Sequence, residues 1–399
     1  MDQPLIYFDN AATGWPKPEN VYTFMDHFYR TLGVNPGRSG YDMAIEAGSL
    51  LAKLRTRLTK FFGGDEDEPE RLILSYNATD AMNLILPGLI GPGDHVVTTN
   101  LEHNCVIRPV NHLVRDDGAE ATFVRFNAAG FVEPDDIKAA LRCNTKAVVV
   151  IHGSNVLGTV QPIGQIGRIC RERGVTFIVD AAQTAGVIPI NMKAMNVDVV
   201  VFTGHKGMMG SMGIGGLCVR KHVMVRQVRS GGTGVRSIEP YHLEEYPFRL
   251  EYGTPNMVGV AALWAGQDWL DEQGVEKVHA QEMKLARKLV EGFREIDGVR
   301  MYCCESLENH LATLLINLEG VDPGDVGTIL DVDHSIATRT GLHCAPLVHR
   351  QLGLVENHGG VRFSVGPFNT DQDVAAAIEA VARIAGWARG RKLNRRVAA

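Results

Sequence analysis

Short, continuously apolar runs recur between residues 71 and 220, and stretches long enough for a helix separate most of them. These runs are the candidate strands Arg71–Ser75, His95–Thr99, Ala121–Phe126, Ala147–Ile151, Val175–Asp180, Asp198–Thr203 and Gly215–Val219. Several are apolar at every position rather than alternating, as expected of strands that are buried on both faces. The pattern predicts an α/β fold with a mostly parallel, doubly wound sheet of seven strands covered by helices.

The pattern changes after about residue 258. The candidate elements there are a helix at Gly274–Ile296, strands near Arg300–Cys303, Ala312–Leu318 and Val361–Val365, and a last helix from Asp371 to about Trp387. We therefore expect a large domain at 21–258 and a smaller α+β domain at 259–399, which an N-terminal segment at 1–20 joins. The acidic segment Asp65–Glu70 is predicted to be a solvated loop before the first strand.

Composition excludes several classes of protein. With 399 residues, 45% apolar and 22% charged, the chain has ordinary globular composition, and its net charge of −6 offers no global basic field for nucleic acid. Its aliphatic runs are far shorter than the roughly 20 residues of a membrane span, and the start shows no signal peptide. We expect a cytoplasmic protein that binds neither nucleic acid nor a membrane.

The seven cysteines form neither a disulfide framework nor a metal site, because they are widely spread and no CxxC pair occurs. Four of them are predicted to be buried, inert thiols: Cys105, Cys143, Cys170 and Cys218. Cys344 differs, because Gly341, His343 and Pro346 around it favour a loop.

Two strands of the predicted sheet end in residues that carry chemistry. Asp180 ends one strand, and the next is followed by Thr203-Gly-His-Lys206. In an open α/β sheet, ligands bind at the carboxyl ends of the strands. A lysine behind an apolar strand is partly desolvated, which lowers its pKa and makes Lys206 a candidate for Schiff-base formation.

Two further motifs converge on the same edge. Asn77-Ala78-Thr79-Asp80 opens a helix whose free N–H groups can hold a phosphate, and Leu101-Glu-His103-Asn104 adds an imidazole. Each motif alone has an ordinary explanation as a helix cap or a structural histidine. Together, a phosphate site, a lysine, an aspartate and a histidine suit pyridoxal 5′-phosphate (PLP), which needs an amine, an acid partner for its ring nitrogen and a face to lie on.

The motifs resemble those of the PLP-dependent class V aminotransferase-like family, in its short-loop cysteine desulfurase and selenocysteine lyase branch. Seven motifs match in order: Tyr7–Thr13, Leu101–Asn104, Ser154–Thr159, Val179–Gln183, Thr203–Lys206, Gly253–Asn256 and Arg339–Cys344. The resemblance covers nearly the whole chain and implies PLP fold type I.

The resemblance also implies roles around the cofactor ring. Lys206 would bind PLP covalently and later move the substrate's Cα proton. Asp180 would pair with the pyridine nitrogen, His103 would stack on the ring and help in proton transfer, and Gln183 would hydrogen-bond the phenolate oxygen.

Further residues would hold the phosphate and the substrate. Ala78, Thr79, Thr203 and His205 would bind the phosphate, and Thr254 would reach the phosphate of a neighbouring subunit, which implies a homodimer. Asn155, counted among the cofactor-binding residues as well, would bind the substrate carboxylate with Arg362 and Arg339. No residue is expected to bind a metal.

Cys344 separates the branches of the family, because an aminotransferase does not need a cysteine there. The resemblance implies that Cys344 takes sulfur from L-cysteine as a persulfide, releases L-alanine and passes the sulfur to an acceptor thiol or a partner protein. His343 and Arg339 are expected to lower the pKa of its thiol. This chain departs from many relatives at two positions, since it has Gly37 (before Arg38) and Leu342 where they often have a histidine. The loop after the cysteine is short, because only 18 positions separate Cys344 from Arg362.

Alternative functions remain open at this stage. The substrate could be L-selenocysteine, or the enzyme could be a class V aminotransferase, epimerase or β-lyase, and a PLP-binding accessory subunit is a third class. A dinucleotide-binding oxidoreductase is rejected, because the glycines at 210–216 follow a lysine and do not join a strand to a helix.

Overall fold

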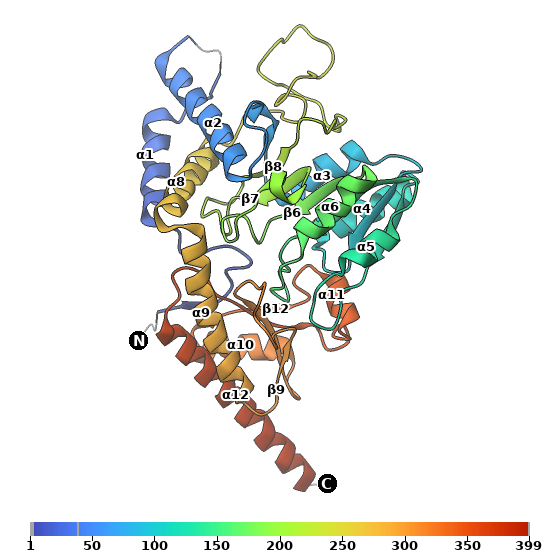
Figure 1. Cartoon of the computed structure of the whole chain (residues 1–399). Coiled ribbons are helices and arrows are strands. Elements are labelled where there is room, and N and C mark those ends of the chain that lie inside the picture. The colour runs from blue at the N-terminus through green and yellow to red at the C-terminus, as the bar shows by residue number, and fades with distance from the viewer. Residues whose placement is uncertain (1–3, 38–39, 398–399) are drawn as a thin grey trace.

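A seven-stranded sheet forms the centre of the larger part of the molecule. The computed structural model describes residues 4–37 and 40–397 (Figure 1). The sheet order is β2-β8-β7-β6-β5-β3-β4. Its strands are β2 (Leu72–Ser75), β3 (His95–Thr99), β4 (Glu120–Val124), β5 (Thr145–Ile151), β6 (Thr176–Asp180), β7 (Val199–Thr203) and β8 (Gly215–Val219). Only β8 runs antiparallel to its neighbours, β2 and β7, which confirms the mostly parallel sheet.

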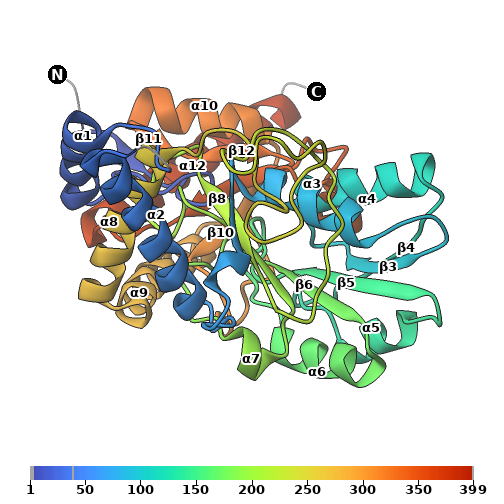
Figure 2. The same ribbon diagram turned by 90° about the horizontal axis from the view of Figure 1, so that it is seen from above.

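Helices cover both faces of this sheet, which explains the continuous apolar runs. They are α3 (Ala78–Leu89) and α4 (Asn104–Asp116) on one face, and α5 (Pro134–Ala140), α6 (Ile163–Arg173) and α7 (Met192–Met195) on the other (Figure 2). Successive side chains of a strand point to opposite faces. Val96 accordingly packs in one core with Val106 of α4, whereas Val97 packs in another with Ile166 of α6.

A second, antiparallel sheet has the order β12-β13-β10-β9. Its strands are β9 (Val299–Tyr302), β10 (Thr313–Leu318), β12 (Arg339–Gly341) and β13 (Gly360–Ser364), and the helices of this part are α9 (Val275–Arg294), α10 (Pro323–His334), α11 (Pro346–Gln351) and α12 (Asp371–Val397). Phe363 of β13 and Phe293 of α9 meet in its core at 5.2 Å between ring centroids. The elements predicted after residue 274 are confirmed.

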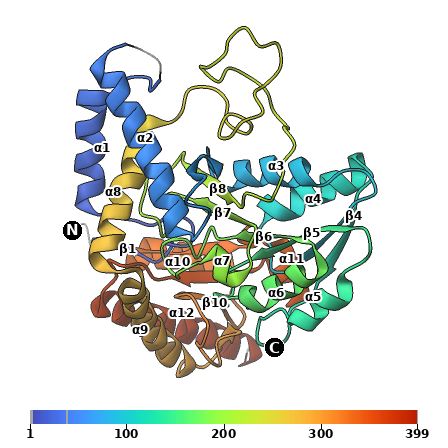
Figure 3. The same ribbon diagram turned by 45° about the horizontal axis from the view of Figure 1, so that its top comes forward.

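A further helix, α8 (Met257–Gln273), was not predicted from the sequence. It is buried along most of its length, so it is apolar nearly all round and shows no helical period. It packs against α1 (Glu19–Leu32) and α2 (Asp42–Phe61) (Figure 1). The residues between β8 and α8, 220–256, form a long irregular segment that extends from the body of the molecule (Figure 3).

The N-terminal residues lie along the second sheet. Strand β1 (Ile6–Tyr7) pairs in parallel with β11 (Ile336–Ala337), and Phe8 is fully buried with its ring 5.8 Å from that of Phe363. Residues 9–14 then continue toward the large sheet. The division of the chain at residues 20 and 258 stays a prediction.

The exposure of two residues, Asp65 and Cys143, differs from what the sequence predicts. In the acidic segment Glu66, Asp67 and Glu70 are exposed as expected, but Asp65 is buried, where it accepts hydrogen bonds from Arg220 Nε at 3.0 Å and the Lys221 N–H at 2.7 Å. Cys143 is exposed, because it lies in the turn between α5 and β5. Among the described residues, no helix is both long and apolar enough to cross a membrane.

Replacement of Phe8 tests how firmly the N-terminal segment is anchored. We expect Phe8→Ala to lower the free energy of unfolding by about 3–5 kcal/mol, because it leaves a cavity against Phe363. Urea titration measures this change, and Tyr29→Ala on α1, whose side chain is 65% exposed, is the control. Equal stability of the two variants would contradict the anchoring role.

Candidate active site

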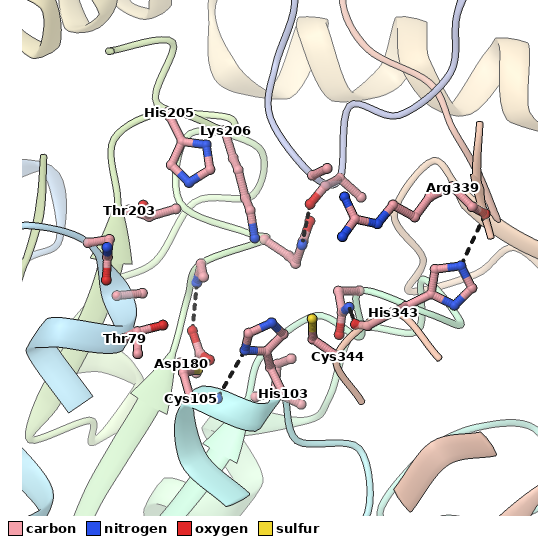
Figure 4. A pocket seen from close by; sticks show the side chains of 18 of the residues that line it. Thr79, His103, Cys105, Asp180, Thr203, His205, Lys206, Arg339, His343 and Cys344 are labelled. Carbon is pink, nitrogen blue, oxygen red and sulfur yellow. Dashed lines mark hydrogen bonds between the residues drawn. The ribbon is translucent and has the colours of Figure 1, made fainter. Parts of the chain in front are cut away.

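The predicted site residues meet in one pocket of about 280 Å³ at the carboxyl ends of the large sheet's strands (Figure 4). The lining includes nearly all of them: Ala78, Thr79, His103, Asn155, Asp180, Gln183, Thr203, His205, Lys206, Arg339, Cys344 and Arg362. Thr254 does not line it. The large sheet therefore supplies one wall, and the second sheet, with the loop after β12, supplies the other.

Lys206 and Asp180 come from the ends of two neighbouring strands. Lys206 is half-buried in the pocket wall, and burial lowers the pKa of its amine, although attraction to Asp180 opposes the shift. Asp180 ends β6, where its Oδ1 accepts a hydrogen bond from the Ala182 N–H at 2.9 Å. The Cys105 thiol donates to its other oxygen at 3.3 Å, so Cys105 is a buried residue of the site and not a remote core thiol.

The start of α3 forms a cradle for an anion. The Asn77 side chain caps the helix by accepting from the Asp80 N–H at 2.9 Å, and the residues that follow it, Ala78 and Thr79, line the pocket. First-turn N–H groups have no partner within the helix and favour negative charge. A Cβ at Gly215 would lie 2.8 Å from the Asn77 Cα, so only glycine lets β8 approach this turn.

Two further polar atoms on the pocket wall lack partners. Among the described residues, Thr203 Oγ1 and His205 Nδ1 are buried without a hydrogen bond. Burial lowers the pKa of His205 to about 4, so the ring is neutral at physiological pH and acts as a hydrogen-bonding group. Buried polar atoms are normally paired. The two atoms therefore point to a ligand.

His103 is also neutral. Burial lowers its pKa to about 4, and its Nδ1 accepts a hydrogen bond from the Cys105 N–H at 3.0 Å. Its proton therefore lies on Nε2. Glu102 beside it accepts from Thr99 Oγ1 at 2.7 Å and from the Ile151 N–H at 3.0 Å, which ties the ends of β3 and β5 together. Burial raises the pKa of Glu102 to about 8.

Arg362 extends from β13 into the pocket and binds two other parts of the chain. Its Nη1 donates to the Asn155 carbonyl at 3.0 Å and its Nη2 to Asp9 Oδ1 at 2.6 Å, whereas its buried Nε has no partner among the described residues. Arg339 lies 3.9 Å from the other oxygen of Asp9. Asp9 was not among the predicted site residues, although it stands within the motif Tyr7–Thr13.

The N-terminal segment also fixes the peptide before the lysine. The His205 carbonyl accepts from Lys17 Nζ at 2.6 Å, Thr13 Oγ1 at 3.1 Å and the Gly14 N–H at 3.0 Å. Burial lowers the pKa of Lys17 to about 8. Gln183 donates to the Ala11 carbonyl at 2.9 Å, so it too holds this segment. No sequence pattern pointed to Lys17.

Cys344 lies in a tightly held loop. It is exposed, and its sulfur is turned toward the pocket (Figure 4). Its φ is 55° and that of His343 is 51°, both in the left-handed region that side chains disfavour. The His343 carbonyl accepts from Asn155 Nδ2 at 2.7 Å, and the Cys344 carbonyl accepts from the Asn104 N–H at 2.7 Å. These bonds hold the loop in its strained form.

The expected influence of His343 on this thiol is wrong. Burial, helped by the positive charge of Arg362, holds the pKa of the His343 imidazole well below its usual range. A neutral imidazole cannot supply the positive charge that stabilises a thiolate. Arg339 lines the same pocket as Cys344.

Thr254 lies elsewhere. It is exposed in the 220–256 segment and lines a separate pocket of about 860 Å³, together with Gly37. Arg38 lies outside the described residues. Within the part of the chain that is described, no group of three histidine, cysteine or acidic side chains could hold a metal ion.

The residues present fit pyridoxal phosphate. The α3 cradle, with the unpartnered Thr203 Oγ1 and His205 Nδ1, offers a phosphate site. Asp180 offers a carboxylate for the ring nitrogen, and Lys206 offers for the aldehyde an amine whose pKa is lowered by burial. The volume of the pocket, about 280 Å³, is slightly below the range of about 300–1,000 Å³ that is typical of small-molecule sites.

Known proteins with similar sequences share this architecture. The sequence profile of "Aminotransferase class-V" matches residues 6–376. The chain is 33% identical to a "Probable cysteine desulfurase" of Methanothermobacter thermautotrophicus, over 96% of this chain and 95% of that protein. It is 30% identical to a "Cysteine desulfurase" of Haloferax volcanii, over 95% and 89% of the respective chains.

Solved structures of cysteine desulfurases have the same fold as this chain. The apo cysteine desulfurase of Thermococcus onnurineus NA1 superposes with a TM-score of 0.90 at 32% identity, covering 96% of this chain and 95% of that one. The S-sulfonic acid form of a cysteine desulfurase from Escherichia coli gives 0.84 at 25% identity, over 95% and 94%. These matches confirm PLP fold type I. The chain belongs to the aminotransferase class-V family, a family of PLP-dependent enzymes.

Proposed function

We propose that the protein is a cysteine desulfurase, which converts L-cysteine to L-alanine and takes the sulfur onto Cys344 as a persulfide. One observation carries the proposal: an exposed cysteine is held at the pocket that also contains Lys206 and Arg362. An enzyme that only moves amino groups has no use for a thiol at this place. The names of the similar proteins support the same reaction.

Residues of the large sheet would hold the cofactor and move protons. Pyridoxal phosphate, when bound, supplies an electron sink that makes the Cα proton of an amino acid acidic. Lys206 is suited to take and return that proton, because its lowered pKa increases the share of free amine. Asp180 would hold a proton on the ring nitrogen, and His103 would stack on the ring, since both line the pocket.

Arg362 would bind the substrate carboxylate. Its unpartnered Nε and its Nη2 form a fork, which matches the two oxygens of a carboxylate. To use the fork, the substrate must displace Asp9 from Nη2. Asp9 can then move toward Arg339, which already lies 3.9 Å from its other oxygen.

Cys344 would complete the reaction. Its thiolate attacks the substrate sulfur, so that a new S–S bond forms while the carbon–sulfur bond breaks and leaves its electron pair on the carbon side. A proton then joins Cβ, and the organic product is alanine. The sulfur remains on Cys344 as a persulfide.

The active unit would be a homodimer. Thr254 is exposed outside its own chain's active site, and the same segment exposes Ile238 (93%) and Tyr241 (86%), as expected of a surface that a second copy covers.

All seven cysteines are free, which fits a reducing compartment such as the cytoplasm.

Replacement of the nucleophile tests the function. We expect Cys344→Ala to retain the absorbance of bound cofactor but to form alanine from L-cysteine at least about 100-fold more slowly, because the sulfur has no acceptor. Alanine released in the presence of dithiothreitol measures the rate. Cys143→Ala, which removes an exposed thiol outside the pocket, is the control. Equal alanine from both variants would refute the role of Cys344, and activity only on L-selenocysteine would indicate a lyase.

Replacement of Arg362 tests substrate binding. We expect Arg362→Lys to raise KM for L-cysteine about 10–100-fold with a smaller effect on kcat, because a lysine cannot form the fork and charge-assisted hydrogen bonds contribute about 1.5–3 kcal/mol. Initial rates over a range of L-cysteine concentrations measure the split. Arg30→Lys, at a side chain that is 75% exposed, is the control. An unchanged KM would place the substrate carboxylate elsewhere.

A further inference from the structure

A second chamber, of about 630 Å³, adjoins the Cys344 loop. One face of α4 forms part of its wall through Asn104, Ile107, Arg108 and Asn111, and α11 adds a second face. Arg339, His343 and Cys344 line both this chamber and the active-site pocket, whereas Lys206 lines only the latter. Cys344 therefore stands where the two spaces meet.

The chamber is positively charged. Its lining carries Arg108, Arg339 and Arg350, and none of the described residues that line it is acidic. Arg108 and Arg350 are exposed, and neither forms an ion pair with a described acidic side chain. Grooves lined by charge of one sign concentrate ligands of the opposite sign, and arginine matches carboxylates in particular.

The size of the chamber suits a small molecule. Ligand sites typically measure about 300–1,000 Å³ and combine apolar walls with a few placed polar groups. Ile107, Leu342 and Leu347 supply apolar surface beside the three arginines.

The hydrogen bonds of the Cys344 loop also limit which acceptor molecules can reach the persulfide sulfur. The His343 carbonyl accepts a hydrogen bond from Asn155 Nδ2, and the Cys344 carbonyl accepts one from the Asn104 N–H. The sulfur therefore cannot travel far out to meet the thiol of a large partner. Because Cys344 is exposed and lines the chamber, an acceptor that occupies the chamber can reach the sulfur.

We infer that this chamber admits the sulfur acceptor, and that the acceptor is a low-molecular-weight thiol bearing one or more carboxylates. The inference rests on the proposed function. The acceptor thiolate attacks the outer sulfur of the Cys344 persulfide, a new S–S bond forms, and the bond to Cys344 Sγ breaks with its electron pair on Sγ. Cys344 returns to the thiolate and the acceptor becomes a persulfide, so no outside oxidant or reductant is needed.

Alkylation of the resting holoenzyme tests the chamber without turnover. Iodoacetate is an anion and iodoacetamide is its neutral analogue, and peptide mass spectrometry gives the rate at each cysteine. We expect the ratio of the two rates to be about tenfold higher at Cys344 than at exposed Cys143, and to fall as salt is added. Cys143 is a suitable reference because the adjacent Arg142 is paired with Glu120.

Variants separate the chamber from the active-site pocket, which is also cationic. Arg108→Gln with Arg350→Gln should bring the ratio at Cys344 toward that at Cys143 and leave the iodoacetamide rate unchanged. Both side chains are exposed and neither lines the active-site pocket, so folding and alanine formation should persist. A ratio that stays at the wild-type value would overturn the inference.

Discharge of the persulfide identifies the acceptor class. Enzyme charged with L-cysteine and freed of substrate is mixed with 3-mercaptopropionate or 2-mercaptoethanol at equal thiolate concentration, and loss of the persulfide is followed by mass spectrometry. We expect the anionic thiol to react about tenfold faster in the wild type, and both thiols to react at similar rates in the double variant. Absence of any persulfide would refute the proposed function, whereas the alkylation ratio would still judge the chamber. Equal discharge by both thiols, or faster discharge only by an acidic peptide that carries a cysteine, would overturn a small anionic acceptor.

Discussion

The guanidinium of Arg362 holds three distant parts of the chain together at the active site. It extends from β13 of the second sheet, donates to the carbonyl of Asn155 after β5 of the large sheet, and pairs with Asp9 of the N-terminal segment. Removing one partner from a buried pair costs about 3–5 kcal/mol, because the other charge is left uncompensated. The same group is the one that a substrate carboxylate would use. Binding and assembly of the pocket therefore depend on one side chain.

Burial, rather than nearby charge, sets the protonation of most groups around the pocket. It holds the pKa of His103 and His205 at about 4, so both imidazoles act as neutral donors and acceptors, and it also lowers the pKa of the Lys206 amine. Burial raises the pKa of Glu102 to about 8, so this carboxyl links two strand ends without adding a full charge. The charges that remain at buried positions therefore interact more strongly than they would in water.

The sequence predicts what is local or repeats along the chain. Apolar runs located the strands of the large sheet, and the residues at strand ends located Lys206 and Asp180, because parallel strands bring their ends to one edge. It could not predict the contact of Asp9 with Arg362, since 353 positions separate them. Nor could it predict a neutral His343, whose charge depends on burial by the assembled loop. Helix α8 was missed because a helix that is buried all round loses its period.

The loop that carries Cys344 is strained in its backbone, and its hydrogen bonds restrain the thiol. The backbones of His343 and Cys344 both adopt the left-handed conformation, which is unfavourable for residues other than glycine and persists only where the surroundings hold it. Asn155 provides part of that hold through its side chain, and its own carbonyl accepts from Arg362. A substrate that binds to Arg362 therefore changes the surroundings of Asn155, the residue whose side chain also restrains the Cys344 loop. Because a restrained thiol stays within reach of the substrate, the acceptor has to come to it, and the basic chamber beside the loop is the space from which it can do so.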